Sequence, residues 1–359
     1  MNLRVHPAIP SGAAPLRTSG GRLIVLLTSV LLVACSQPAP EVAELAGETM
    51  GTSFSVKLSP APDAAILASL KAQIEQRLEA INAQMSTYRS NSDLTRFNQA
   101  PDTDWQSQPV SVVALVEQAN RISQLSGGRY DITVGPLVNL WGFGNSGSRS
   151  SPPSQQEIDQ VLQGVGYRQL HTRRMPPGLR KETAQLQIDL SSIAKGWAVD
   201  QIATLLRAKG LTGFLVEIGG EVRAQGQKSS GRPWRIAIEQ PSYDTREVRR
   251  VITLRDTAMA TSGDYRNFFA DAGQLYSHTI DPASGHPVQH RLASVTVLAD
   301  DCATADAWAT ALLAMGDRHA PELADKLDLK VLFIIRSADG LSETPSRALS
   351  ESGLLDATP

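Results

Sequence analysis

The spacing of hydrophobic residues along the chain predicts four long or medium helices. In the first, apolar residues recur three and four positions apart and so share one face: Leu67, Leu70, Ile74, Leu78 and Ile81. A second apolar face runs through 112–122 and ends at Gly127 or Gly128. Helices are also predicted over 193–209 and 303–315, each followed by a glycine. Ser154 and Glu157 form a capping-box signal for a further, short helix.

Alternation of apolar and polar residues predicts the strands. Phe54, Val56 and Leu58 alternate with polar neighbours, as in a strand that is buried on one face. Short apolar runs bounded by turn residues predict further strands at 186–190, 214–218, 222–224, 234–239, 251–254, 292–298 and 331–335. Helices interleave with strands, and many consecutive strands are joined as hairpins. We therefore expect an α+β fold with largely antiparallel sheets and packed helices.

The first 34 residues have the pattern of a signal peptide. Three arginines accompany an apolar run, Leu23 to Val33, that is shorter than the roughly 20 residues of a membrane-spanning helix. The run ends in Leu-Val-Ala-Cys, which is similar to a bacterial lipobox, in which the cysteine is diacylated. The alternative is a plain signal peptide with an incidental cysteine. We predict a signal peptide over 1–34, lipidated Cys35 and a tether over 35–46, a folded domain over 47–337 and a C-terminal tail over 338–359.

Composition narrows the classes of partner. After residue 34 the chain keeps 31 basic and 36 acidic residues, and nothing in this balance favours nucleic-acid binding, which would call for a basic surface. Cys302 is the other cysteine besides Cys35, so no intramolecular disulfide is expected. The sequence contains no Walker A pattern, which argues against P-loop nucleotide binding.

Asp306 and Thr310 are the most informative polar pair. They are four positions apart on a predicted helix, so both side chains project from one face, and the alanines around them leave room for another group. A carboxylate and a hydroxyl on such a surface suit a hard cation such as Mg²⁺. The alternative is an acid favoured by the helix dipole and a threonine bonded to its own backbone.

The segment IDLSSIAKG offers a possible anion site. Asp189 ends a predicted strand, Ser191 and Ser192 begin a helix, and Lys195 lies in its first turns. A helix N-terminus with a nearby lysine can bind an anion, although Asp189 or Ser191 could equally be a simple N-cap. The later Gly219-Gly220 pair is best interpreted as a hairpin turn.

The segment YSHTIDPASGHP, residues 276–287, combines a turn with a titratable side chain. Pro282 and Gly285 favour a chain reversal, and His278 and Asp281 lie beside it. His278 could be an ordinary surface histidine or a proton acceptor. No second histidine or cysteine stands at metal-ligand spacing from His278, so zinc is not predicted there. Segments around Met50, Tyr88 and Tyr130 could line a pocket for a flat ring, with Tyr88 stacking on it.

Taken in order, nine segments resemble the ApbE family of FAD:protein FMN transferases. They span about residues 47 to 335 and read ETMGTSFSV, MSTYRSNSDLTRFN, GGRYDITVGPLVNLWGFG, IDLSSIAKGWAVD, VEIGGEVRAQG, WRIAIEQP, ATSGDYRNFF, YSHTIDPASGHPV and ASVTVLADDCATADAWATAL. The resemblance implies an ApbE-like, T-fold-related architecture. It also implies Mg²⁺-dependent cleavage of FAD, transfer of FMN to a Ser or Thr hydroxyl of a partner protein, and release of AMP.

The same resemblance assigns roles to individual residues. His278 would be the base that accepts the proton of the acceptor hydroxyl. The metal would be held by Asp306, Thr310 and Ser192, the last through its backbone carbonyl. The residues implied to contact FAD are Met50, Tyr88, Arg129, Tyr130, Asp131, Asp189, Lys195 and Ile280. Lys195 stands where some relatives carry glutamate.

The resemblance also implies partners and a location. The acceptors would be periplasm-facing flavoprotein subunits of membrane redox complexes, of the Na⁺-translocating NADH:quinone reductase or Rnf type. The protein would be extracytoplasmic and held to a bacterial membrane through its lipid anchor. Two alternatives stay open at this point: a Mg²⁺-dependent FAD pyrophosphatase, in which water replaces the acceptor, and an FAD-binding lipoprotein without catalysis.

Overall fold

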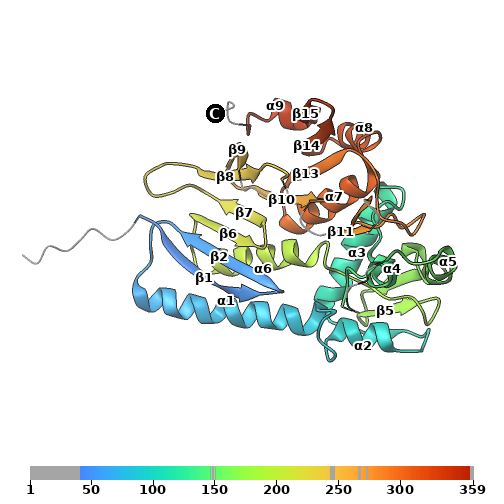
Figure 1. Ribbon diagram of the computed structural model, residues 1–359. Coiled ribbons are helices and arrows are strands. Elements are labelled where there is room, and N and C mark those ends of the chain that lie inside the picture. Colours follow the sequence, from blue (N-terminus) through green and yellow to red (C-terminus); the bar gives the residue numbers. More distant parts are fainter. Residues whose placement is uncertain are drawn as a thin grey trace, which may run out of the picture. The chain divides into compact units, whose positions relative to one another are not determined.

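Five of the predicted strands pair antiparallel within one large sheet in the computed structural model (Figure 1). Across the sheet, the strands follow the order β1 (Ala43–Thr49), β2 (Thr52–Leu58), β6 (Phe214–Ile218), β7 (Glu221–Gln225), β10 (Ala258–Gly263), β13 (Leu292–Ala299), β14 (Lys330–Ser337) and β15 (Gly340–Pro345). The structure describes residues 41–355 except 146, 148, 150, 243–246, 266–267 and 272–273. The predicted signal peptide and Cys35 lie outside the described residues.

The alternation of side chains gives the sheet two buried faces. Phe214, Val216 and Ile218 of β6 belong to a large core, whereas Leu215 between them belongs to a second, smaller core on the opposite face. This is the period of two expected for a strand buried on both sides. The described residues contain no helix long and apolar enough to span a bilayer.

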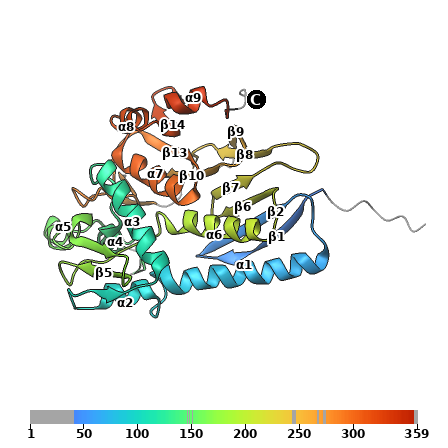
Figure 2. The same ribbon diagram turned by 180° about the vertical axis from the view of Figure 1, so that it is seen from behind.

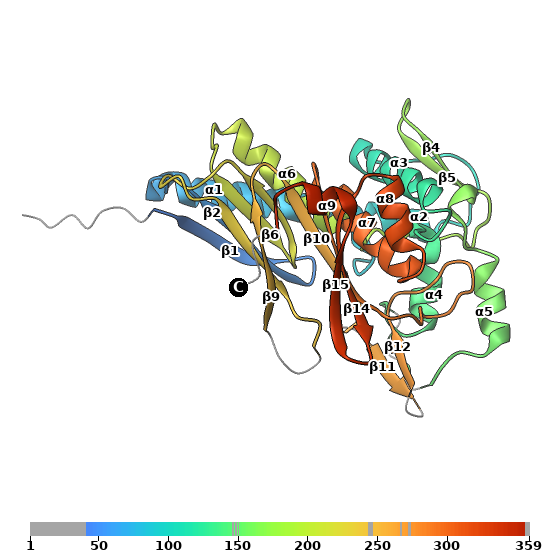
Figure 3. The same ribbon diagram turned by 90° about the horizontal axis from the view of Figure 1, so that it is seen from above.

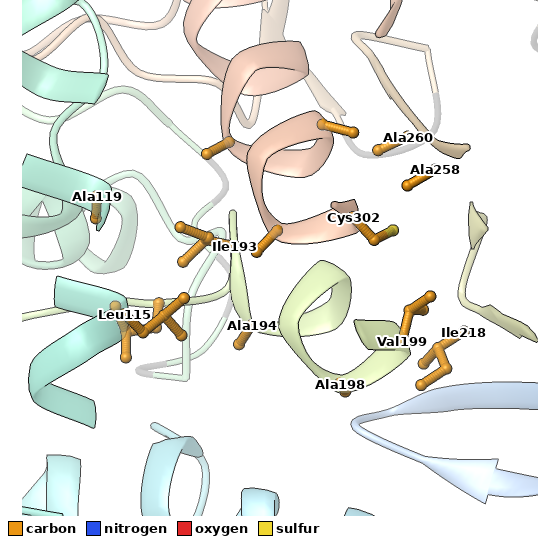
Figure 4. Packing of buried hydrophobic residues seen from close by; sticks show 14 of the residues in the cluster. Leu115, Ala119, Ile193, Ala194, Ala198, Val199, Ile218, Ala258, Ala260 and Cys302 are labelled. Carbon is orange, nitrogen blue, oxygen red and sulfur yellow. The ribbon is translucent and has the colours of Figure 1, made fainter. Parts of the chain in front are cut away.

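The large core is covered by helices. They are α1 (Ala64–Met85), α2 (Asp93–Gln99), α3 (Val110–Leu125), α6 (Ala194–Ala208), α7 (Cys302–Met315) and α8 (Ala320–Lys326). α1 and α6 both run along the sheet, as the opposite views in Figures 1 and 2 show. Figure 4 shows the region where α3, α6 and α7 meet, with Leu115 and Ile193 facing each other and Cys302 beside Ala258.

The smaller core is closed by the hairpin of β8 (Trp234–Glu239) and β9 (Val248–Leu254), together with α9 (Arg347–Glu351). Viewed from above, β9 lies on the other side of the strands from α1 and α6 (Figure 3).

A third cluster packs around Trp141. It involves α4 (Gly135–Leu140), α5 (Gln155–Leu162) and the hairpin of β11 (Phe268–Asp271) and β12 (Gln274–Ser277). A small sheet contains β3 (Gln106–Ser107), β4 (Leu170–Arg173) and β5 (Gly178–Lys181). The predicted capping box of Ser154 and Glu157 begins α5.

One predicted strand, 186–190, is wrong. The segment is extended and its leucines and isoleucine are buried, but it joins no ladder. The side-chain amide of Asn98 takes the place of a neighbouring strand, because it donates to the carbonyl of Ile188 and accepts from its N–H, both at 2.8 Å. The N–H of Asp189 donates to the carbonyl of Ile132 at 2.7 Å. Burial made the segment resemble a strand, while its hydrogen-bond partners lie on α2 and on a short 3₁₀ helix over Ile132–Val134.

Both predicted domain boundaries also need correction. The predicted tether over 35–46 overlaps β1, which begins at Ala43, and the predicted tail over 338–359 contains β15 and α9. β1 and β15 are the edge strands of the large sheet, and β15 alternates between exposed and half-buried residues. Edge strands bury few side chains, so their apolar pattern is too weak to mark them in the sequence.

Candidate active site

A cavity of about 870 Å³ brings together segments that are far apart in the sequence. Most residues implied by the family resemblance lie on its wall: Tyr88, Arg129, Tyr130, Asp131, Asp189, Ser192, Lys195, His278, Ile280, Asp306 and Thr310. Met50 is not on this wall. It occupies the turn between β1 and β2 with φ of 52° and packs against the large core. The individual roles of these residues stay predictions.

Asp306 lies on α7 but does not cap this helix. The first N–H groups of α7 are bonded by other acids, since Asp200 accepts from Cys302 and Ala303 and Asp301 accepts from Thr304. Asp306 instead reaches across to α6, where its Oδ2 accepts the N–H of Gly196 at 3.0 Å. Burial raises the pKa of Asp306, while the charge of Lys195 opposes this shift.

Thr310 faces the same cavity one helical turn further on. Its hydroxyl is 3.2 Å from the hydroxyl of Ser262 on β10, so it bonds across to the sheet, not back to its own helix. Ser192 donates its hydroxyl to the phenolic oxygen of Tyr130 at 3.0 Å. The role of the backbone carbonyl of Ser192 as a metal ligand stays a prediction.

These donors fit a hard cation better than a soft one. The described part of the chain holds no cluster of three or more His, Cys, Asp or Glu side chains that could bind a metal. One buried carboxylate, a hydroxyl and a carbonyl oxygen form a sparse, all-oxygen set of the kind Mg²⁺ uses when substrate phosphates and water complete its shell. Asp306 is 3% exposed, and a buried carboxylate is stabilised by a cation beside it.

The close approach of α6 and α7 depends on Gly196. A Cβ at this position would lie 2.3 Å from the carbonyl oxygen of Cys302 and 2.8 Å from the Cα of Ala303. A side chain of any size would therefore force the helices apart. Gly196 directly follows Lys195, so the same contact places the lysine next to Asp306.

Lys195 forms an ion pair that the sequence did not indicate, in which the lysine side chain is 28% exposed and the glutamate side chain 4%. Its Nζ lies 2.6 Å from Oε2 of Glu221, the first residue of β7. Burial alone would lower the pKa of Lys195, but Asp306 and Glu221 outweigh burial and raise it. Burial raises the pKa of Glu221 despite the nearby ammonium. The lysine is therefore a permanent cation on the cavity wall, and it cannot serve as a base near neutral pH.

The turn that carries Glu221 confirms the hairpin interpretation of Gly219-Gly220. Both glycines have positive φ, 59° and 104°, and Ile218 pairs directly with Glu221 across them. A Cβ on Gly219 would lie 2.8 Å from Thr52. The turn thus fits closely against β2 and still borders the cavity.

The N-cap alternative for the segment before α6 is wrong. α6 begins at Ala194 after a turn over 191–193, and its cap residue Ile193 makes no side-chain capping bond. Asp189 accepts the N–H of Ser191 at 2.8 Å, which shapes the turn before the helix.

Asp131 serves the local structure with its side chain. One of its oxygens accepts from the N–H and the hydroxyl of Thr133, and the other accepts the N–H of Tyr167 at 2.7 Å. Burial raises the pKa of Asp131, although these hydrogen bonds oppose the shift. Tyr88, in contrast, is 73% exposed at the cavity wall, so its ring face is accessible for stacking.

His278 follows β12 and precedes the predicted turn. The turn is present: Gly285 has φ of 72°, its N–H donates to the carbonyl of Asp281, and the indole of Trp141 donates to the carbonyl of Gly285 at 2.8 Å. The carboxylate of Asp281 accepts from Arg129 at 3.0 Å and from groups within the turn. The imidazole of His278 is half-buried and meets the ring of Phe143 edge-on. The segment is therefore a braced turn with a histidine at the cavity.

Among the cavity residues that sequence reasoning missed, three make contacts that shape the site or its surroundings. Glu221 is an acidic residue at the start of a largely buried strand, which is a weak sequence signal for a functional residue. Ser262 and Asn98 carry no such signal, because their importance comes from partners on other elements, Thr310 and Ile188.

The fold and the site define the class of this protein. It is an antiparallel α+β protein whose large cavity combines oxygen ligands suited to a cation, the ammonium of Lys195 and the imidazole of His278. The chain belongs to the ApbE family, whose model matches residues 50–333. The chain is 42% identical over 326 residues to the FAD:protein FMN transferase of Vibrio cholerae, covering 90% of this chain and 96% of that one. It is 37% identical over 330 residues to the protein of that name from Escherichia coli K12, covering 89% of this chain and 93% of the relative.

The solved structures agree with the sequence comparison. The flavin transferase ApbE from Vibrio cholerae superimposes with a TM-score of 0.79 at 41% identity, covering 86% of this chain and 98% of that one. The apo form of the Pseudomonas stutzeri flavinyl transferase ApbE gives 0.80 at 38% identity, with coverages of 89% and 98%. The predicted α+β, ApbE-like fold is confirmed.

Proposed function

We propose that this protein is an FAD:protein FMN transferase, which moves the FMN moiety of FAD to a Ser or Thr hydroxyl of a partner protein and releases AMP. The observation that carries the proposal is the single cavity shared by Asp306, Thr310, Lys195, His278 and Tyr88. The name of the Vibrio cholerae relative supports it, since that protein covers nearly all of this chain at 42% identity.

The reaction is an in-line displacement at the FMN phosphorus. A new bond forms between that phosphorus and the acceptor hydroxyl oxygen, while the bond to the bridging oxygen of the pyrophosphate breaks. AMP leaves with the bridging oxygen and its electron pair. Such a transfer depends on positioning and on neutralising charge more than on covalent catalysis by the protein.

His278 is the residue proposed to remove the acceptor proton. An aliphatic hydroxyl is a weak nucleophile, and a neutral imidazole can take its proton near pH 7. The braced turn after His278 and the ring of Phe143 restrict where the imidazole can lie. Asp281 contributes by holding this turn to Arg129.

Asp306, Thr310 and the backbone carbonyl of Ser192 would hold Mg²⁺. When bound, Mg²⁺ would neutralise charge on the pyrophosphate oxygens and on departing AMP. Lys195 adds a second positive charge on the same wall, and Tyr88 offers its exposed ring to the isoalloxazine. Met50, Arg129, Tyr130, Asp131, Asp189 and Ile280 complete the proposed FAD contacts, with Met50 having the weakest support because it lies off the cavity wall.

The partners and the location are part of the same proposal. Diacylation of Cys35 after removal of residues 1–34 would anchor the protein on the outer side of a bacterial membrane. Acceptors would then be periplasm-facing flavoprotein subunits of Na⁺-translocating NADH:quinone reductase or Rnf-type complexes. The compact unit that begins at Pro40 would stand on a short tether beside them.

Mass spectrometry of an acceptor tests the proposal directly. Purified residues 36–359, which include the whole compact unit, are mixed with FAD, Mg²⁺ and a periplasmic flavoprotein subunit, and AMP is assayed in parallel. A mass gain of one FMN on the acceptor, with release of AMP, is expected. Free FMN and AMP without a mass gain would instead identify a pyrophosphatase, and bound FAD without AMP would identify a carrier.

A further inference from the structure

Glu221 is connected to the proposed metal site through its ion pair with Lys195. The Glu221 side chain is 4% exposed, and its Oε2 lies 2.6 Å from Nζ of Lys195. It begins β7 directly after the Gly219-Gly220 turn, where its pairing with Ile218 fixes its backbone. A Cβ on Gly219 would lie 3.4 Å from Cδ of Lys195, so the lysine stem runs along this turn toward the glutamate.

Lys195 has a second carboxylate within reach of its charge. Asp306 accepts the N–H of Gly196, the residue next to Lys195, and each of the two side chains favours the charged form of the other. Asp306 also borders the cavity, and only its Oδ2 has a hydrogen-bond partner among the residues that the structure describes. The other oxygen would be the natural partner of an ammonium that was not already held elsewhere.

We propose that Glu221 is a positioning residue that holds the ammonium of Lys195 away from Asp306 and so keeps the second oxygen of Asp306 available to a divalent cation. The inference rests on the proposed metal site at Asp306 and Thr310. It assigns Glu221 no contact with the metal or with FAD. Without Glu221, Lys195 would turn to Asp306, because a buried charge left without a partner is costly, and the cation would then have to displace it.

A double-mutant cycle measured on metal binding alone tests the proposal. Mg²⁺ is titrated calorimetrically into residues 36–359 without FAD, for wild type, Glu221→Gln, Lys195→Met and the double variant. We expect Glu221→Gln to weaken Mg²⁺ binding about tenfold, within the usual range of coupling between sites. In the Lys195→Met background the same change should alter the dissociation constant by less than about threefold, because no ammonium remains to be misplaced.

Glu217→Gln is the matched control. Glu217 lies on the same hairpin and on the same cavity wall, and its carboxylate accepts the N–H of Gly220 at 2.7 Å. Its replacement makes the same change from carboxyl group to amide and should leave Mg²⁺ affinity within about twofold. An equal loss in Glu217→Gln and Glu221→Gln would reduce the effect to general electrostatics and overturn the proposal.

The decisive comparison is between Lys195→Met and the double variant, which remains available if Glu221→Gln alone fails to fold. A tenfold difference between these two would show that Glu221 acts without Lys195 and would overturn the proposal. Asp306→Ala separates the two levels of inference. If it binds Mg²⁺ as well as wild type does, the proposed metal site itself fails. If it abolishes binding while the cycle shows no coupling, only the role of Glu221 fails.

Discussion

Replacing Gly196 with alanine tests whether the spacing of α6 and α7 sets the active site. The added Cβ would meet the carbonyl oxygen of Cys302 at 2.3 Å and its carbonyl carbon at 2.6 Å. Ordinary contact begins near 3.4 Å, so the helices would have to separate by about 1 Å at this point. Both obstacles are backbone atoms, which cannot move aside by a change of rotamer.

The expected cost has two parts. Overpacking a core contact of this kind destabilises a protein by about 1–3 kcal/mol. The gain in helix propensity from glycine to alanine, about 1 kcal/mol, would offset part of that loss. The separation also lengthens the 3.0 Å bond between the N–H of Gly196 and Asp306. A displacement near 1 Å at a catalytic group can lower the rate about 10²-fold.

Urea unfolding and FMN transfer, measured on the same preparations, check both parts. The control is Ala208→Ser, which adds one atom at the exposed end of the same helix and should change stability by less than about 0.5 kcal/mol. A Gly196→Ala protein with wild-type stability and wild-type transfer rate would refute the argument that this contact sets the position of Asp306.

Three further predictions concern charge and proton transfer. His278→Ala should bind FAD normally and lose transfer about 10²–10⁴-fold; an unchanged single-turnover rate would remove the base assignment. Asp306→Ala should lose Mg²⁺ binding and transfer together, by calorimetry and AMP release; full activity with EDTA present would contradict the metal site. Burial raises the pKa of Glu221 from 4.5 to about 8, so the folded state binds the extra proton and metal-free stability should fall as pH rises from about 4.5 to 8. Urea midpoints should show a flatter profile for Glu221→Gln, and parallel profiles would contradict this.

Much of the fold was predictable because its signals are local. The strand over Thr52–Leu58 and the helix beginning beside Cys302 follow from side-chain periodicity within one segment. The capping box of Ser154 and Glu157 involves residues three apart and was likewise predicted. The family resemblance also selected segments that line one cavity, although it included Met50, which lies off the cavity wall.

The errors share a physical cause. Residues 186–190 are as apolar as a strand, but a strand needs a neighbour, and its partner here is the amide of Asn98. The edge strands β1 and β15 belong to the large sheet but bury few side chains, so the spacing of apolar residues did not predict them. Strand pairing depends on residues far away in the chain, and no local pattern contains that information.

By itself, the sequence determined most of the helical and extended segments, the faces they bury and the residue types available for chemistry, since each of these depends mainly on neighbours within a few positions. Only the tertiary structure decided how those residues meet. The contact at Gly196 places Asp306 beside Lys195, and the turn before β7 places Glu221 against the same ammonium. Packing across the whole core sets the distances between elements. These distances in turn decide how buried each titratable group is and which charges lie near it, and so the direction in which its pKa shifts.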